Sequence, residues 1–169
     1  RVFLLLHVVI MPFYWWGVGI GVPTAMRLAE PAFHEVELAD EGVTETNVVV
    51  FFAPDPYTGF YPMVIRRFYD YPIPESWQTL SMAPRDHEVV RTGPDRFELR
   101  VLGGEMLATP FEQLMRSKDF PLRPGDQVSM KGYTVEVLET GAWGPRRIAV
   151  SVAGTLEDKA YTFLAWRDG

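Results

Sequence analysis

The stretch HEVVRTGPDRFELRV, residues 87–101, carries the clearest structural signal in this chain of 169 residues. Two runs of apolar and charged residues flank the sequence TGPD, a composition that is typical of the turn of a β-hairpin. In the second run Phe97, Leu99 and Val101 alternate with charged residues, which is the period of a half-buried strand. We therefore predict an antiparallel hairpin over these residues.

Similar short elements follow towards the C-terminus. Thr109, Pro110 and Glu112 form the start signal of a short helix, because a capping box and a proline at the first helical position favour initiation there. Strand-like runs separated by turns then fill residues 127–166. Together with the hairpin they give about seven strands, without the strand and helix alternation of a parallel sheet. The predicted fold class is mainly β, a compact antiparallel β-sandwich or small barrel with one short helix.

The region before the hairpin is rich in aromatic residues and prolines. Residues 48–52 are β-branched and aromatic and predict a further strand, and residues 63–69 predict another. The aromatic side chains around them, with carboxylates nearby, suit a cleft for a carbohydrate or a peptide, but they also suit a β core or a membrane interface. The residues of this possible ligand or membrane-interface surface are Tyr57, Phe60, Tyr61, Tyr69, Tyr71 and Trp77.

The N-terminal segment is the most apolar part of the chain. Residues 2–26 contain no Asp, Glu, Lys or Arg and are long enough to cross a hydrocarbon core of about 30 Å. A signal peptide has a shorter apolar region and a buried soluble helix has a polar face, so these remain the less favoured interpretations. The predicted organisation is a transmembrane helix at 1–26, a juxtamembrane connector at 27–42 and a β-rich soluble domain at 43–169.

Two features of this segment indicate contacts within a membrane. Gly17, Gly19 and Gly21 form a small-residue stripe that would let a neighbouring helix approach closely, which favours other transmembrane helices or subunits as partners. His7 is the only ionisable group inside the predicted span. It is a candidate axial ligand of haem or of a chlorophyll-type pigment, or else a hydrogen-bonding or snorkelling residue.

Charge and composition exclude several classes of function. Residues 27–169 hold 15 basic and 22 acidic residues, a net charge of −7, which disfavours binding to nucleic acid. The absence of cysteine excludes disulfides, thiolate catalysis and cysteine-ligated metal sites. Phosphate-binding loops and the usual hydrolase and metalloprotease motifs are also missing. A triad of Ser81 and His87 with an acid is the weakest option, and we assign no catalytic or metal-ligating residue.

A series of short motifs runs through the second half of the chain. Their residues are Pro110, Leu114 and Arg116, then Gly125, Asp126 and Val128, then Val135, Val137 and Gly144, and finally Trp166, Asp168 and Gly169. On these residues the chain, over about residues 78–169, resembles the C-terminal extracytoplasmic β domain of a group of bacterial multi-span membrane proteins of unknown function. The spacer that the group has before its proline is missing here, since Pro145 follows Gly144 directly. The resemblance implies membrane helices followed by an extracytoplasmic β domain, and no activity.

The sequence thus favours a non-catalytic, membrane-anchored accessory or structural domain that acts in assembly or interaction within a larger membrane protein or complex. We expect it in a bacterial cell membrane, in contact with lipids, with residues 27–169 outside the cytoplasm. One alternative is an extracytoplasmic ligand-binding module, either a sensor or a carbohydrate-binding domain. The other is a membrane subunit that bears a cofactor or pigment on His7.

Overall fold

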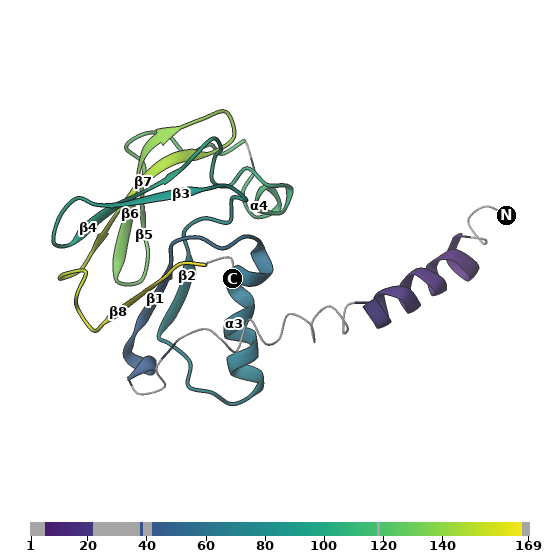
Figure 1. Cartoon of the computed structure of the whole chain (residues 1–169). Coiled ribbons are helices and arrows are strands. Elements are labelled where there is room, and N and C mark those ends of the chain that lie inside the picture. Colours follow the sequence, from purple (N-terminus) through teal and green to yellow (C-terminus); the bar gives the residue numbers. More distant parts are fainter. Residues whose placement is uncertain (1–5, 22–37, 39–41, 118, 167–169) are drawn as a thin grey trace. The chain divides into compact units, whose positions relative to one another are not determined.

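The computed structural model describes residues 6–21, 38, 42–117 and 119–166 (Figure 1). The chain divides into two compact units, Arg1–Glu37 and Leu38–Gly169. The boundary between them falls inside the connector that the sequence predicts at 27–42. Each unit is described below by itself.

The described residues of the first unit, 6–21, form one helical segment. The π-helix η1 (Leu6–Ile10) is followed by α-helical residues 11–21, and large side chains such as Trp16, 68% exposed, lie on its surface. Within the ranges that the structure describes, no helix is both long enough and apolar enough to span a membrane. The other residues of the predicted span at 1–26, and most of the connector, lie outside those ranges, so both remain predictions.

The second unit contains an antiparallel sheet of five strands (Figure 1). The strands lie in the order β3-β4-β7-β6-β5, with bounds β3 (His87–Arg91), β4 (Arg96–Val101), β5 (Gln127–Ser129), β6 (Tyr133–Thr140) and β7 (Pro145–Val152). β3 and β4 form the predicted hairpin, with Val89 opposite Leu99. Phe97, Leu99 and Val101 are all buried. The hairpin and its inward-facing residues are therefore confirmed.

The second sheet has three strands and differs from the prediction. Its order is β2-β1-β8, with bounds β1 (Asn47–Val50), β2 (Ser76–Thr79) and β8 (Tyr161–Leu164). β1 is the central strand and runs parallel to both of its neighbours. Neither sheet closes on itself. The unit is therefore a mixed α/β fold, and the prediction of a wholly antiparallel sandwich or barrel is wrong for this sheet.

Helix α3 (Pro56–Phe68) connects β1 to β2 and makes a β-α-β unit. The predicted strand at 63–69 is therefore wrong. The backbone N–H of Thr58 donates to Asp55 Oδ1 at 3.0 Å and caps the helix start. Pro56 occupies the first turn, where a missing N–H costs nothing, while Pro62 removes one hydrogen bond farther along. Both prolines are thus compatible with this helix.

The described part of the unit also contains two shorter helices, η2 (Val43–Glu45) and α4 (Pro110–Met115). In α4 the Thr109 hydroxyl accepts from the backbone N–H of Glu112, and the Glu112 carboxylate accepts from the backbone N–H of Thr109. The predicted capping box is therefore confirmed.

The core lies between the two sheets. Val49 of β1 packs with residues of the antiparallel sheet that include Leu99 and Val150, all three with no measurable exposure. The ring of Phe97 lies 5.0 Å from that of Phe51 and 5.7 Å from that of Phe163 between ring centroids. The Tyr161 hydroxyl donates to the carbonyl oxygen of Gly132 at 2.5 Å. Aromatic packing and this hydrogen bond therefore join the parallel sheet to the antiparallel one.

A half-buried carboxylate fixes the turn between β6 and β7. Glu105, whose side chain is 10% exposed, accepts the backbone N–H groups of Ala142, Trp143 and Gly144 at 2.6–3.0 Å. The Arg146 guanidinium also donates to Glu105 Oε1, at 3.0 Å. Burial alone would raise the pKa of Glu105, but the hydrogen bonds from Trp143 and Arg146 outweigh it, so the pKa is lowered. The turn is thereby tied to the segment before α4.

This close approach makes Gly144 hard to replace. A Cβ atom at Gly144 would overlap the carbonyl oxygen of Met106, and backbone on both sides leaves little room to relax. We expect Gly144→Ala to lower the free energy of unfolding by about 3 kcal/mol in urea titrations. In the control Gly93→Ala, the nearest atom is the flexible Asp95 carboxylate at 3.3 Å. Equal stability losses in the two variants would contradict this packing.

Candidate functional site

Helix α3 covers the outer face of the parallel sheet and presents its other side to solvent. The Trp77 indole Nε1 and the Thr79 hydroxyl of β2 both donate to the carbonyl oxygen of Gly59, at 2.7 and 2.8 Å. Gly59 is buried, and a Cβ atom there would lie 3.3 Å from Met82 Sδ. The small residue thus allows the helix to lie close to β2, and this contact decides which side of α3 faces outward.

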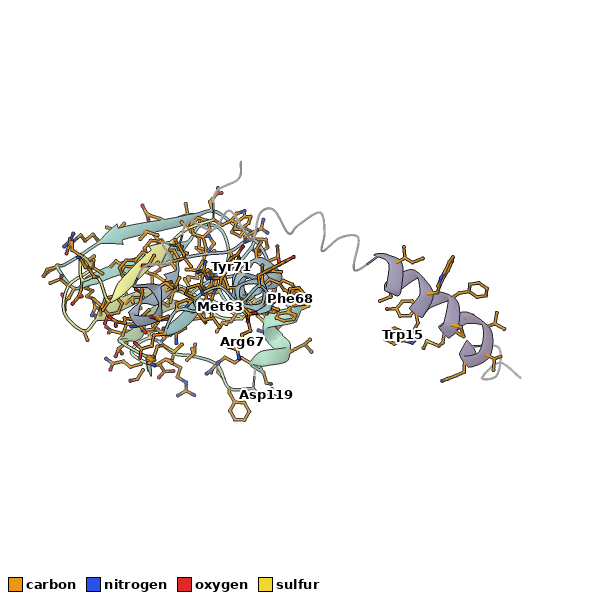
Figure 2. All side chains as sticks on the ribbon, turned by 90° about the horizontal axis from the view of Figure 1, so that it is seen from below. Trp15, Met63, Arg67, Phe68, Tyr71 and Asp119 are labelled. Carbon is orange, nitrogen blue, oxygen red and sulfur yellow. The ribbon has the colours of Figure 1, made fainter. Side chains whose placement is uncertain are left out.

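Three apolar residues line that outward side. Phe60, Val64 and Phe68 are 43%, 47% and 76% exposed, and their spacing of four residues places them on one helical face. We call these three residues the α3 stripe. Arg67 is exposed beside it, and Figure 2 shows Arg67 and Phe68 together on α3. Exposed apolar residues gathered on one face of a domain commonly mark an interaction surface.

The electrostatic character of α3 differs from that of the rest of the unit. Residues 56–69 contain two arginines and no acidic residue, although residues 27–169 carry a net charge of −7. Arg66 is 9% exposed, donates from Nε to the carbonyl oxygen of Pro72 at 2.8 Å, and lies over the ring of Tyr71. Arg66 therefore fixes the segment after the helix, and Arg67 remains the exposed positive charge of this surface.

The structure distributes the predicted aromatic surface over α3 and its flanks. Phe60, Tyr69 and Tyr71 are partly exposed, and Tyr61 is half-buried with its ring centroid 5.7 Å from that of Phe60. Trp77 belongs instead to the contact between α3 and β2. Tyr57 lies in α3, and its side chain is outside the described set. The grouping of Phe60, Val64 and Phe68 on one face was not predicted, because a strand at 63–69 leaves Phe60 outside the element, whereas the helix includes it.

The predicted membrane features lie in the first unit. His7 is exposed in η1. Gly17 and Gly21 share one face of the α-helical residues 11–21, but Gly19 points roughly 200° away from Gly17, so the three do not form a single stripe. A Cβ atom at any of them would meet nothing within 4 Å. Ligation of a haem or pigment by His7 and helix packing on the glycines remain predictions.

A hydrogen bond joins Ser81 to His87 beyond the end of β2. The distance between Ser81 Oγ and His87 Nε2 is 2.8 Å, and the His87 ring stacks on Phe52 at 4.6 Å and 2°. Ser81 Oγ also accepts from the backbone N–H of Ala83 at 3.3 Å, which favours donation of its proton to Nε2. Burial lowers the pKa of His87, against opposing contributions from the Arg85 backbone and the Asp86 charge.

This pair fixes loops and lacks the geometry of a nucleophilic triad. Ser81 is 2% exposed, so its hydroxyl cannot meet a substrate carbon. Within the described part of the chain, no side-chain carboxylate accepts a hydrogen bond from His87 Nδ1, as a triad requires. Nor does that part contain a group of three or more His, Asp or Glu side chains able to hold a metal ion. The contact ties the segment after β2 to the start of β3.

Comparisons with protein-family models, with curated proteins and with solved structures find no match to this chain. The resemblance of residues 78–169 to a group of membrane proteins therefore remains a prediction.

The lowered pKa of His87 predicts a pH dependence of stability. The unfolded chain takes up a proton near the ordinary pKa of 6.5, whereas the folded chain does so only at lower pH. The free energy of unfolding should therefore fall as the pH drops from about 7.5 to about 5.5. His87→Gln should flatten this slope in urea titrations. Glu105 does not interfere, because its ordinary pKa of 4.5 lies below this range. An unchanged slope in the variant would contradict the assignment.

Proposed function

We propose that this chain is a non-catalytic accessory domain held at a bacterial membrane, and that the α3 stripe lies against the bilayer surface. The observation that carries the proposal is the combination of exposed Phe60, Val64 and Phe68 with exposed Arg67 on a helix without acidic residues. Aromatic and aliphatic side chains enter the interface between headgroups and acyl chains, and arginine is attracted to anionic lipid.

The apolar N-terminal segment supports the same location. Residues 2–26 carry no charged group apart from the titratable His7. If they insert in a bilayer, the eleven residues from 27 to 37 limit the distance from residue 26 to the start of the second unit to about 43 Å. The resemblance of residues 78–169 to extracytoplasmic domains leads us to propose that this unit lies outside the cytoplasm. Its role would be assembly or interaction with neighbouring membrane helices or subunits.

Fluorescent labels at single cysteines test the docking of α3. The chain has no native cysteine, so Phe68→Cys can carry one environment-sensitive nitrobenzoxadiazole label. In vesicles of phosphatidylcholine with some phosphatidylglycerol, we expect the emission of this label on the full chain to be shifted to the blue of the free label in water. The matched control is Val90→Cys on β3, which is 46% exposed and should not shift.

A third label, at Trp15→Cys, separates anchoring from docking. A shift at position 15 without one at position 68 would contradict docking by α3 and leave the membrane anchor standing. No shift at either position would contradict both.

The charge of Arg67 supplies an independent test. Arg67→Glu removes one attraction to anionic lipid and adds a repulsion, so we expect the affinity of α3 for anionic vesicles to fall about tenfold. The measurement is the lipid dependence of the label shift at position 68. Arg123→Glu, at another exposed arginine, should leave it unchanged. Equal effects of the two substitutions would contradict a specific contact between Arg67 and lipid, because binding would then depend only on the net charge of the chain.

A further inference from the structure

The three parallel strands end at one edge of their sheet, and a cleft lies there. Segments that follow β1, β2 and β8 meet the start of β3 around a volume of about 570 Å³. Phe52, Arg85, Asp86, His87 and Trp166 are among the residues that line it. The volume is in the range of small-molecule sites. In sheets with parallel strands, ligands commonly bind outside the carboxyl ends.

The aromatic walls of this cleft are already held in place. The His87 ring is fixed on one side by the Phe52 ring and on its edge by Ser81. The backbone N–H of Trp166 donates to the carbonyl oxygen of Phe52 at 3.3 Å, which holds the segment after β8 beside the segment after β1. These side chains would therefore lose little conformational entropy when a ligand binds against them.

Two opposite charges lie on the same cleft without a partner in the described residues. The Arg85 guanidinium and the Asp86 carboxylate are exposed and take part in no ion pair there. The Arg85 stem packs against Gly104, where a Cβ atom would come within 2.9 Å of Arg85 Cγ. Five other arginines of the unit do pair with a carboxylate, namely Arg91, Arg96, Arg100, Arg146 and Arg147.

Other ligand classes fit this edge less well. A nucleotide phosphate would normally bind the free N-terminus of the helix after the first strand, but Asp55 already accepts the backbone N–H of Thr58 there. Its carboxylate would repel a phosphate. Covalent attachment to Ser81 is prevented by burial of that residue.

We propose that the cleft binds a small zwitterion with an aromatic side chain, of the class of a free aromatic amino acid. Its carboxylate pairs with Arg85, its ammonium group pairs with Asp86, and its ring lies against the aromatic walls formed by Phe52 with His87 and by Trp166. Charge-assisted pairs with both ends fix the orientation of such a ligand, and the walls supply apolar contact. This site lies apart from the α3 stripe and does not depend on membrane docking.

Titration calorimetry of the full chain in detergent tests the proposal. The probes are L-phenylalanine, N-acetyl-L-phenylalanine, L-phenylalaninamide and glucose. L-phenylalanine should bind, and blocking either of its charged ends should weaken binding about tenfold. In Arg85→Gln the amide should bind as well as the free acid, and in Asp86→Asn acetylation should have no further effect. The controls Arg123→Gln and Asp119→Asn should behave like the unmodified chain.

Three results would overturn the proposal. The first is that L-phenylalanine does not bind at millimolar concentration. The second is that the free and the blocked amino acids bind with equal affinity. The third is that glucose binds more tightly than any of them. The blocked probes decide the matter on the unmodified chain even if a variant fails to fold. If L-phenylalanine does not bind but α3 still docks on vesicles, the proposal for the cleft fails and the proposed function stands.

Discussion

The burial of β1 on both of its faces is the constraint on which the rest of the second unit depends. Val48 and Val49 have no measurable exposure and Val50 has 6%. Val49 points into the core shared with the antiparallel sheet, and strand alternation directs Val48 and Val50 to the opposite face. That face needs its own cover, which α3 supplies. Because β1 runs parallel to β2, the connection between them crosses from one end of the sheet to the other, and the helix fits that crossing.

The two sides of the unit differ as a consequence. On the antiparallel sheet, charged side chains form a network in which Arg147 pairs with both Glu98 and Glu139, while Arg96 pairs with Glu136. Partly exposed pairs of this kind add little stability, but they keep this face polar. The helix side carries the α3 stripe and an exposed arginine. A domain that is polar on one side and apolar and basic on another suits a position between water and a membrane.

Local signals account for what the sequence predicted correctly. The alternation of Phe97, Leu99 and Val101 and the capping box at Thr109 depend on neighbours in the chain, and both are confirmed. The parallel sheet depends on distant pairs, such as Asn47 with Tyr161, which no local pattern specifies. One hint was present, because residues 48–52 are apolar without alternation, as expected for a strand covered on both faces. Helical spacing of Phe60, Val64 and Phe68 was the hint for α3.

The same difference between local and long-range signals applies to the candidate sites. The aromatic surface was predictable as a set of residues, but its geometry depended on the conformation of 63–69. The contact of Ser81 with His87 and the cleft beside it arise where three segments far apart in the chain meet. Neither is marked by a sequence motif. Tertiary structure alone brings Phe52, His87 and Trp166 to one cleft.

Hydrogen exchange of the β1 amides, followed by NMR on the full chain in detergent, tests the central claim most directly. If β1 is covered on both faces, the amides of residues 48–50 open only when the whole unit unfolds. Their exchange free energies should then equal the unfolding free energy from urea titration and exceed those of the edge strand β5. Exchange of residues 48–50 as fast as that of β5 would contradict the account.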